Sequence, residues 1–359
     1  MEGSTNTPIH YIVWRSQPGG AESLVKDYLE RFSEGRDLYL YSLRTSENEI
    51  SNAPGLRFDS GSDKNWRCYL QFFRYCLRHR AHLFHLVSTG PVTLFLALMA
   101  GVRNPVYHIH GTIYWKKAAD RFYLKAIWRL ISLFKVNYIA NSEYSASVFQ
   151  RKVLPVKPRV VYNGFSVEKF LQKRALRSGL RRMAYIGRLH TGKNVELVFR
   201  LFEDIAGTMP ELELHIAGDG MLRKPLEDYA AASPYGSRIV FHGWVKDMAS
   251  FYESVDLFVF LSAYESFGNV LAEALMTGLP VLTSNLPAFE EIYGGEKAFI
   301  LGPPENFEAL RKKFAQSVGE YPDLAKKAYE LGEHLDTTFK MEAHLASIEN
   351  VYAGREAAG

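Results

Sequence analysis

Short apolar runs alternate with longer amphipathic stretches along the whole chain. In the first half, the apolar runs predict buried strands at 10–14, 38–43, 83–87, 105–109, 136–140 and 160–162. In the second half, they predict strands at 183–186, 212–217, 239–241, 257–260, 280–283 and 298–301. Helical stretches lie between most of these runs, among them 21–32, 66–78 and 114–134. Strand–helix–strand alternation predicts parallel sheets covered by helices on both faces.

The pattern falls into two blocks. A chain of 359 residues is too long for one ordinary core, and the charged stretch 171–180 (LQKRALRSGL) has no strand character. We therefore predict two doubly wound domains, at residues 1–172 and 173–337, followed by a terminal segment at 338–359. The stretch 45–63, which is rich in Ser, Asn, Asp and Gly, reads as a long loop.

The composition is that of a folded globular protein, with 47% hydrophobic and 23% charged residues. Cys68 and Cys76 are the only cysteines, which argues against a disulfide-stapled secreted protein. The first eight residues are polar, and no apolar run reaches the roughly eighteen residues of a membrane span. We expect a cytoplasmic protein.

Charge is distributed unevenly. The net charge of +4 combines +10 in residues 1–170 with −6 in the remainder, and between Lys64 and Lys135 twelve basic residues face a single acid, Asp120. Along one predicted helix, basic residues recur every four positions beside aromatic rings: Lys117, Arg121, Lys125 and Arg129, with Trp115, Phe122 and Trp128. This pattern favours an anionic membrane surface as partner. The alternative is an ordinary half-buried helix with a solvated basic face. Nucleic acid is disfavoured as a partner because the sequence contains no nucleic-acid-recognition motif.

The stretch Ala263–Leu275 (AYESFGNVLAEAL) contains the most informative candidate functional residues. Glu265 follows a predicted strand, Gly268 marks the start of a helix, and Glu273 lies eight residues after Glu265 inside that helix. Ligands of open α/β sheets bind at this strand edge, and backbone N–H groups at a helix N-terminus bind anionic or hydroxyl oxygens. For Glu265, the alternative is an acidic residue that only favours the helix N-terminus.

ESFGNVLAEAL, followed by TGLPVLTSN, resembles the family-4 retaining glycosyltransferases, which share a Glu-x7-Glu motif. Further segments match that family in order: GGAES at 19–23, HGT at 110–112, NSEYS at 141–145, VVYNGFSVEKF at 160–170, YIGRLHTGKN at 185–194, HIAGDG at 215–220 and FHGWV at 241–245. The resemblance covers nearly the whole chain. It implies a GT-B fold, with two facing Rossmann-like domains and a cleft between them, an acceptor-binding N-terminal domain, a nucleotide-sugar-binding C-terminal domain, and a final helix that crosses back to the N-domain.

The resemblance also implies roles. Arg188 and Lys193 would neutralise the diphosphate leaving group, Glu265 would hold hydroxyls of the donor sugar, and Glu273 would bind the ribose. His110, at a strand end, would face the sugar, so the implied catalytic residues are His110, Arg188, Lys193 and Glu265. The implied donor-binding residues are Gly19, Gly20, Gly187, Gly218, Val245, Glu265, Ser266, Phe267, Gly268, Asn269, Val270 and Glu273. Leu286–Ile292 replaces a Gly-Gly pair common in the family, which leaves the donor sugar open.

The implied reaction transfers a hexose-like sugar from a UDP- or GDP-sugar to an acceptor hydroxyl, with configuration retained. The acceptor would be a lipid-linked or cell-envelope glycan precursor at the cytoplasmic membrane face. No cofactor and no metal is expected, because the chain contains no Asp-x-Asp. A metal cluster drawn from Cys68, Cys76, His79, His82 and His85 is disfavoured, since these residues straddle a helix and a strand. The alternative is a catalytically silent nucleotide-sugar-binding or scaffold protein. A phosphorylase or epimerase of the same fold is a weaker alternative.

Overall fold

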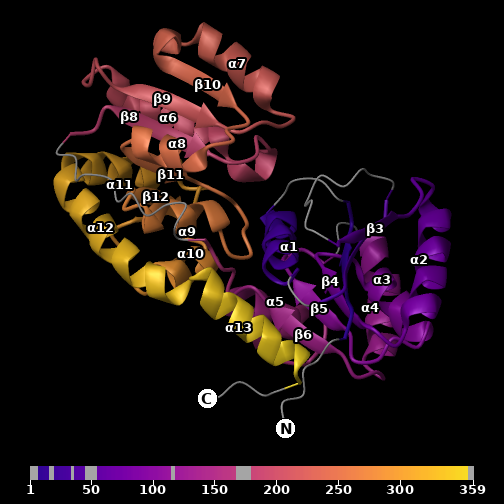
Figure 1. Cartoon of the computed structure of the whole chain (residues 1–359). Coiled ribbons are helices and arrows are strands. Elements are labelled where there is room, and N and C mark those ends of the chain that lie inside the picture. Colours follow the sequence, from indigo (N-terminus) through magenta and orange to yellow (C-terminus); the bar gives the residue numbers. More distant parts are fainter. Residues whose placement is uncertain are drawn as a thin grey trace. The chain divides into compact units, whose positions relative to one another are not determined.

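The computed structural model describes residues 7–15, 20–33, 36–44, 55–114, 118–166 and 179–354. Contacts divide the chain into two compact units. The first unit comprises residues 1–164 and 342–359, and the second comprises residues 165–341. Each unit is a parallel sheet covered by helices, as the alternating pattern predicts (Figure 1).

The first unit contains a seven-stranded parallel sheet in the order β3-β2-β1-β4-β5-β6-β7. Its strands are β1 Ile9–Val13, β2 Leu38–Ser42, β3 Arg57–Ser60, β4 Leu83–Val87, β5 Val106–Ile109, β6 Asn137–Ala140 and β7 Arg159–Val160. Its helices are α1 Gly20–Arg31, α2 Asn65–His79, α3 Pro91–Met99, α4 Ala118–Ile131, α5 Glu143–Lys152 and α13 Met341–Tyr352. Only the first residue of α13, Met341, belongs to the second unit. Right-handed crossovers place α2 to α5 on one face of this sheet, and α1 on the other.

The second unit contains a six-stranded parallel sheet in the order β10-β9-β8-β11-β12-β13. Its strands are β8 Arg182–Ile186, β9 Glu213–Ala217, β10 Ile239–Gly243, β11 Leu257–Phe260, β12 Val281–Ser284 and β13 Ile300–Gly302. Its helices are α6 Val195–Ala206, α7 Arg223–Ala232, α8 Met248–Ser254, α9 Asn269–Met276, α10 Pro287–Ile292, α11 Phe307–Gly319 and α12 Tyr321–Thr338.

The sequence prediction of a loop over 45–63 was wrong in part. Residues 57–60 form the edge strand β3, which pairs with β2. Within the predicted terminal segment 338–359, helix α13 begins at Met341. Phe339 and Lys340 lie between α12 and α13, where the Phe165 N–H donates to the Phe339 carbonyl (2.8 Å) and Lys340 forms a β-bridge to Phe165.

Aromatic side chains fill much of the core of the first unit. Trp128 of α4 packs edge-on against Tyr107 and Phe149, with ring centroids 5.5 and 5.3 Å apart. Only 2% of Trp128 is exposed, so this indole cannot belong to the surface stripe that the sequence suggested. Phe122 on the same helix is 85% exposed and can.

Candidate active site

Two loops of the second unit meet where its strand order changes direction. β8 lies between β9 and β11, so the loops that follow β8 and β11 leave the sheet at its topological switch point. The Ala263 N–H donates to the Gly192 carbonyl (2.9 Å), and the Asn194 side-chain amide donates to the Leu261 carbonyl (2.8 Å). These bonds hold the two loops together at the edge where open α/β sheets bind ligands.

Lys193 and Glu265 form an ion pair between these loops. The Lys193 ammonium donates to Oε1 of Glu265, and the Ser262 hydroxyl donates to the same oxygen (3.0 Å). Both charged side chains are largely withdrawn from solvent, with 20% of Lys193 and 17% of Glu265 exposed. An ammonium carries three N–H donors, so its bond to one carboxylate oxygen leaves capacity for the oxygens of a ligand.

Glycines let the loop after β8 pack against the loop after β9. The Gly187 N–H donates to the Ala217 carbonyl (2.9 Å), and the Leu189 N–H donates to the Asp219 carbonyl (2.9 Å). Gly187 and Gly218 have φ of 142° and 140°, in a region that favours glycine. A Cβ on Gly218 would lie 1.9 Å from the Gly187 carbonyl oxygen. The GDG sequence therefore serves loop packing, and it leaves the side chain of Arg188 exposed at this edge.

The loop after β11 leads directly into α9. Gly268 caps this helix with φ 109°, and the helix begins at Asn269, as the sequence predicts. Phe267 is buried and packs against Phe339, with ring centroids 5.3 Å apart. A Cβ on Gly268 would lie 2.9 Å from the ring of Phe289 in α10. The segment that departs from the family's Gly-Gly pair thus contacts the N-terminus of α9.

Glu273 lies on α9 and is positioned by Tyr252 of α8. The Tyr252 hydroxyl donates to Oε2 of Glu273 (2.7 Å). Burial, followed by the charge of Glu273, raises the pKa of Tyr252 well above its usual value, so the phenol stays protonated and keeps donating. Val245, in the loop after β10, is half-buried in the same unit.

The remaining predicted residues belong to the first unit. His110 follows β5 at the carboxyl edge of that sheet, with its ring centroid 3.9 Å from that of His108. Burial, and next the charge of His344, lower the pKa of His110 to about 3, so its imidazole is neutral at physiological pH. Gly20 is the first residue of α1, whereas Gly19 lies outside the described residues.

Ser262 and Tyr252, the hydroxyl partners of Glu265 and Glu273, were not predicted from the sequence. Ser262 follows the strand Leu257–Phe260, so the strand-end signal that indicated Glu265 applies to it as well. Tyr252 carries no comparable signal, because it contacts Glu273 from a separate helix, 21 positions away in sequence.

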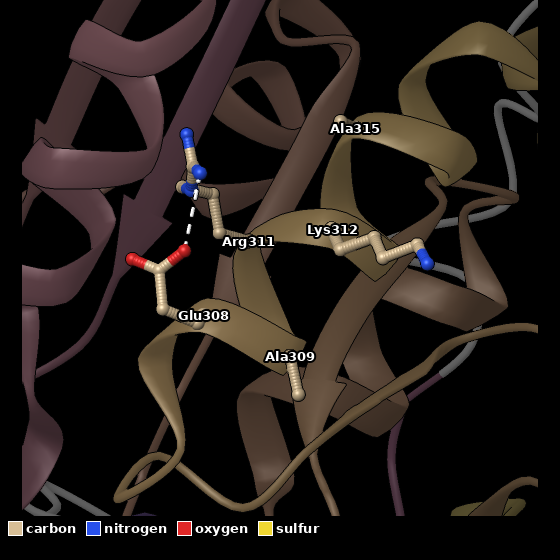
Figure 2. Close-up of a pocket in the computed structure, with 5 residues that line it drawn as sticks. All are labelled: Glu308, Ala309, Arg311, Lys312 and Ala315. Carbon is tan, nitrogen blue, oxygen red and sulfur yellow. Dashed lines mark hydrogen bonds and ion pairs between the residues drawn. The ribbon is translucent and has the colours of Figure 1, made fainter.

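A surface depression elsewhere on the second unit does not compete with this site. All the residues that line it belong to α11: Glu308, Ala309, Arg311, Lys312 and Ala315 (Figure 2). The Arg311 guanidinium donates to the Glu308 carboxylate (3.1 Å) within that helix. The depression thus lies on a single outer helix, and it lacks polar groups that converge from several strand ends, as binding sites of this fold class have.

Comparisons with known proteins converge on glycosyl transfer. Residues 166–334 match the family model described as glycosyl transferases group 1, and this segment contains every candidate residue of the second unit. The chain is 27% identical over 223 residues to UDP-Gal:alpha-D-GlcNAc-diphosphoundecaprenol alpha-1,3-galactosyltransferase of Escherichia coli, covering 56% of this chain and 57% of that protein. It is 30% identical over 200 residues to GDP-mannose:cellobiosyl-diphosphopolyprenol alpha-mannosyltransferase of Xanthomonas campestris, covering 51% and 50%. These alignments span about half the length of the two relatives.

The fold extends over nearly the whole chain. The structure of Anabaena HepE in complex with UDP-glucose superimposes with a TM-score of 0.79 at 18% identity, covering 97% of this chain and all of that one. Sucrose-phosphate synthase from Thermosynechococcus elongatus gives the same TM-score over 97% of this chain and 98% of that chain, also at 18% identity. The chain has the GT-B fold, which confirms the predicted fold class.

Proposed function

We propose that this protein is a retaining glycosyltransferase that moves a hexose-like sugar from a UDP- or GDP-sugar to the hydroxyl of a lipid-linked or cell-envelope glycan precursor. The observation that carries the proposal is the contact between Lys193 and Glu265 at the switch point of the second sheet. It sets a cation, suited to a diphosphate, directly beside a carboxylate, suited to sugar hydroxyls. The names of two relatives, which specify UDP-Gal or GDP-mannose as donor and a polyprenol-linked acceptor, support this choice.

Each residue of the second unit has a role in this proposal. Arg188 and Lys193 neutralise the negative charge that develops on the departing diphosphate. Glu265, held by Ser262, accepts hydrogen bonds from the donor sugar, helped by the backbone N–H groups of residues 266–270 at the start of α9. Glu273, oriented by Tyr252, binds the ribose hydroxyls. Gly187 and Gly218 have no Cβ, so the nucleotide can approach the loop backbone closely. Val245 contributes to the same nucleotide site.

Retention of configuration requires no dedicated protein base. The leaving phosphate takes the proton of the acceptor hydroxyl on the face from which it departs, while the bond to the new oxygen forms. His110, neutral at physiological pH, donates or accepts a hydrogen bond at the donor sugar without adding charge there. Gly19 and Gly20 contact the phosphates. In this proposal residues 1–172 bind the acceptor, residues 173–337 bind the donor, and residues 338–359 return to the first domain.

A catalytically silent sugar-nucleotide-binding protein is the competing function. A thermal-shift panel of UDP- and GDP-sugars identifies the donor, because a bound ligand stabilises the native state by mass action. Release of UDP or GDP from that donor is then followed with and without a polyprenyl-diphosphate glycan. A transferase gives slow release alone and faster release with the acceptor. Stabilisation without any release under either condition contradicts the proposed function.

The donor reaction should not depend on added metal. The positive charge that Mg²⁺ or Mn²⁺ supplies to a diphosphate in other enzymes comes here from Arg188 and Lys193. We expect the initial rate at 25 °C to survive dialysis against EDTA, measured as nucleoside diphosphate release. A loss of activity that Mg²⁺ or Mn²⁺ restores would show that a metal holds the diphosphate.

The helical face of the first unit combines exposed apolar side chains with basic ones. On α4, Phe122 is 85% and Tyr123 is 49% exposed, among exposed Arg121, Lys125 and Arg129. α2 repeats the combination with Trp66, Leu70 and Leu77 beside exposed Arg67, Arg74 and Arg78. α3 contacts both helices, so α2 and α4 flank it on one face. Lys117 and Trp115 of the predicted stripe lie outside the described residues.

We propose that this face binds an anionic membrane surface at the cytoplasmic side, which would bring the enzyme to a lipid-linked acceptor. No helix within the described ranges is long and apolar enough to span a bilayer. Peripheral attachment through side chains fits the exposed rings and cations instead, since rings insert at the interface and cations attract anionic headgroups. The proposed partners are therefore the nucleotide sugar, the glycolipid acceptor and the membrane, and no nucleic acid.

Reversal of charge on α4 should weaken this attachment. Each exposed cation contributes on the order of 1 kcal/mol at an anionic surface, so Arg121→Glu/Lys125→Glu/Arg129→Glu should lower vesicle binding about a hundredfold. The measurement is flotation with liposomes of graded anionic lipid content at low and high salt. The matched control is Lys297→Glu/Lys312→Glu/Lys326→Glu, a triple reversal on the second unit. Equal flotation of both triple variants places the attachment elsewhere, and no flotation of the wild type at low salt refutes it.

A further inference from the structure

Three histidine side chains converge in the first unit, away from every residue assigned above. His10 lies on β1, His79 is the last residue of α2, and His82 lies in the turn before β4. One ligand nitrogen from each ring lies within 4.8 Å of the others. Nε2 of His10 and Nδ1 of His82 lie 2.8 Å apart. A metal cluster of Cys68, Cys76, His79, His82 and His85 was disfavoured from the sequence. In the structure His85 contacts His108 and Tyr352, and His10 lies beside His79 and His82 instead.

The scaffold fixes His10 in one orientation. Its ring stacks on Tyr39 and Phe84, with centroid distances of 4.2 and 4.9 Å and interplanar angles of 11° and 6°. Nδ1 of His10 lies 2.6 Å from the hydroxyl of Tyr75. A hydrogen bond from Nδ1–H to that hydroxyl leaves the lone pair of Nε2 directed at the other two rings. Metal-binding histidines are commonly held in this way, with the second ring nitrogen bonded to a neighbour.

The three rings differ in their access to solvent. His10 is fully buried, so its ring forms the inner side of the cluster. A neutral imidazole nitrogen is the group that binds a divalent cation. His79 and His82 are half-buried, so an ion and a water molecule can reach the cluster from solvent.

We propose that His10, His79 and His82 bind one Zn²⁺ ion, with water in the fourth position. Three imidazole nitrogens suit Zn²⁺ rather than Mg²⁺ or Ca²⁺, which prefer oxygen ligands. Zn–N distances of about 2.0–2.1 Å require the three ligand nitrogens to lie close together, and in this cluster they lie within 4.8 Å of one another. The site lies at the amino edge of the first sheet, opposite the edge that carries His110. Its role is structural, because the ion ties β1 to α2 and to the start of β4.

The test uses the full-length, tag-free protein after chelation and removal of the chelator. We expect one equivalent of Co²⁺ to bind and give the visible absorption bands of a tetrahedral site, and Zn²⁺ to abolish those bands. Zn²⁺ at about a hundred times its dissociation constant should raise the thermal midpoint of the first unit by about 5 °C or more. Mg²⁺ at the same concentration should leave it unchanged. The rate of donor release is a separate readout, so this result does not depend on the proposed function.

Variants assign the binding to this cluster. His79→Gln and His82→Gln replace half-buried rings and should each lower Co²⁺ and Zn²⁺ affinity at least tenfold. The control is His242→Gln, which removes an exposed ring from a two-histidine contact with His215 in the second unit (2.9 Å). Unchanged affinity in both cluster variants, loss of binding only in His242→Gln, or no Co²⁺ bands in the wild type would each overturn the proposal.

Discussion

Replacement of Lys193 by alanine should lower turnover roughly a hundredfold or more, and Arg188→Ala should have an effect of the same order. Loss of one preorganised charge contact to a developing anion costs about 2.7–4 kcal/mol of transition-state stabilisation. Lys193 contributes from a largely buried position beside Glu265, whereas Arg188 approaches from solvent. The measurement is the maximal rate of sugar transfer at saturating donor, together with the thermal midpoint of each variant.

The matched control for this experiment is Lys224→Ala. Lys224 is also a cation of the second unit, but it lies on α7 with its side chain 78% exposed and pairs with Asp228. Exposed pairs of this kind contribute little, so its removal should change neither rate nor stability appreciably. If both Lys193→Ala and Arg188→Ala keep near wild-type turnover with the fold intact, the diphosphate does not bind at this loop.

The second large effect is expected from Gly218→Ala, which should destabilise the second unit by more than about 4 kcal/mol. The added Cβ would lie 1.9 Å from the carbonyl oxygen and 2.8 Å from the carbonyl carbon of Gly187, and backbone cannot move aside as a side chain can. Donor binding should fall with stability, because the same displacement moves the loop that carries Arg188 and Lys193. Calorimetry should show the thermal midpoint of this unit lowered by about 8 °C or more.

Gly302→Ala is the control that separates the cost of backbone strain from the cost of the steric clash expected in Gly218→Ala. Gly302 has φ 126°, close to the 140° of Gly218, but a Cβ there would meet nothing within 4 Å. Strain of this kind alone costs about 1–3 kcal/mol. Equal losses of stability in the two variants would mean that the interlocked loops contribute nothing beyond dihedral strain.

The sheets could be predicted from the sequence because buried parallel strands are continuous apolar runs, as in IHYIV at Ile9–Val13 and LFVF at Leu257–Phe260. β3 was missed for the converse reason. Its sequence, RFDS, contains one apolar residue and lies at the sheet edge with alternate positions exposed. Trp128 was wrongly assigned to the surface because α4 has aromatic residues on two faces, and the periodicity of the sequence does not show which face packs against the core.

The candidate site was only partly visible in the sequence. Glu265 and Glu273 share one motif, and the structure gives each a separate hydroxyl partner. The bond between Lys193 and Glu265 joins residues 72 positions apart, and no local pattern encodes such a distance. His10 was invisible for the same reason, since it reads as one polar position within a buried strand until α2 and β4 bring His79 and His82 beside it.

The first unit is discontinuous in sequence, so its two parts are synthesised at different times. His344 and Tyr352 of α13 bond to Tyr28 (2.7 Å) and His85 (2.7 Å), which the ribosome makes hundreds of residues earlier. At about 5–20 residues per second, the 177 residues of 165–341 separate the two parts by roughly 10–40 s. The seven strands of the first sheet are therefore all synthesised well before α13 can complete their unit. During that interval Tyr28 and His85 lack the hydrogen-bond partners that α13 supplies.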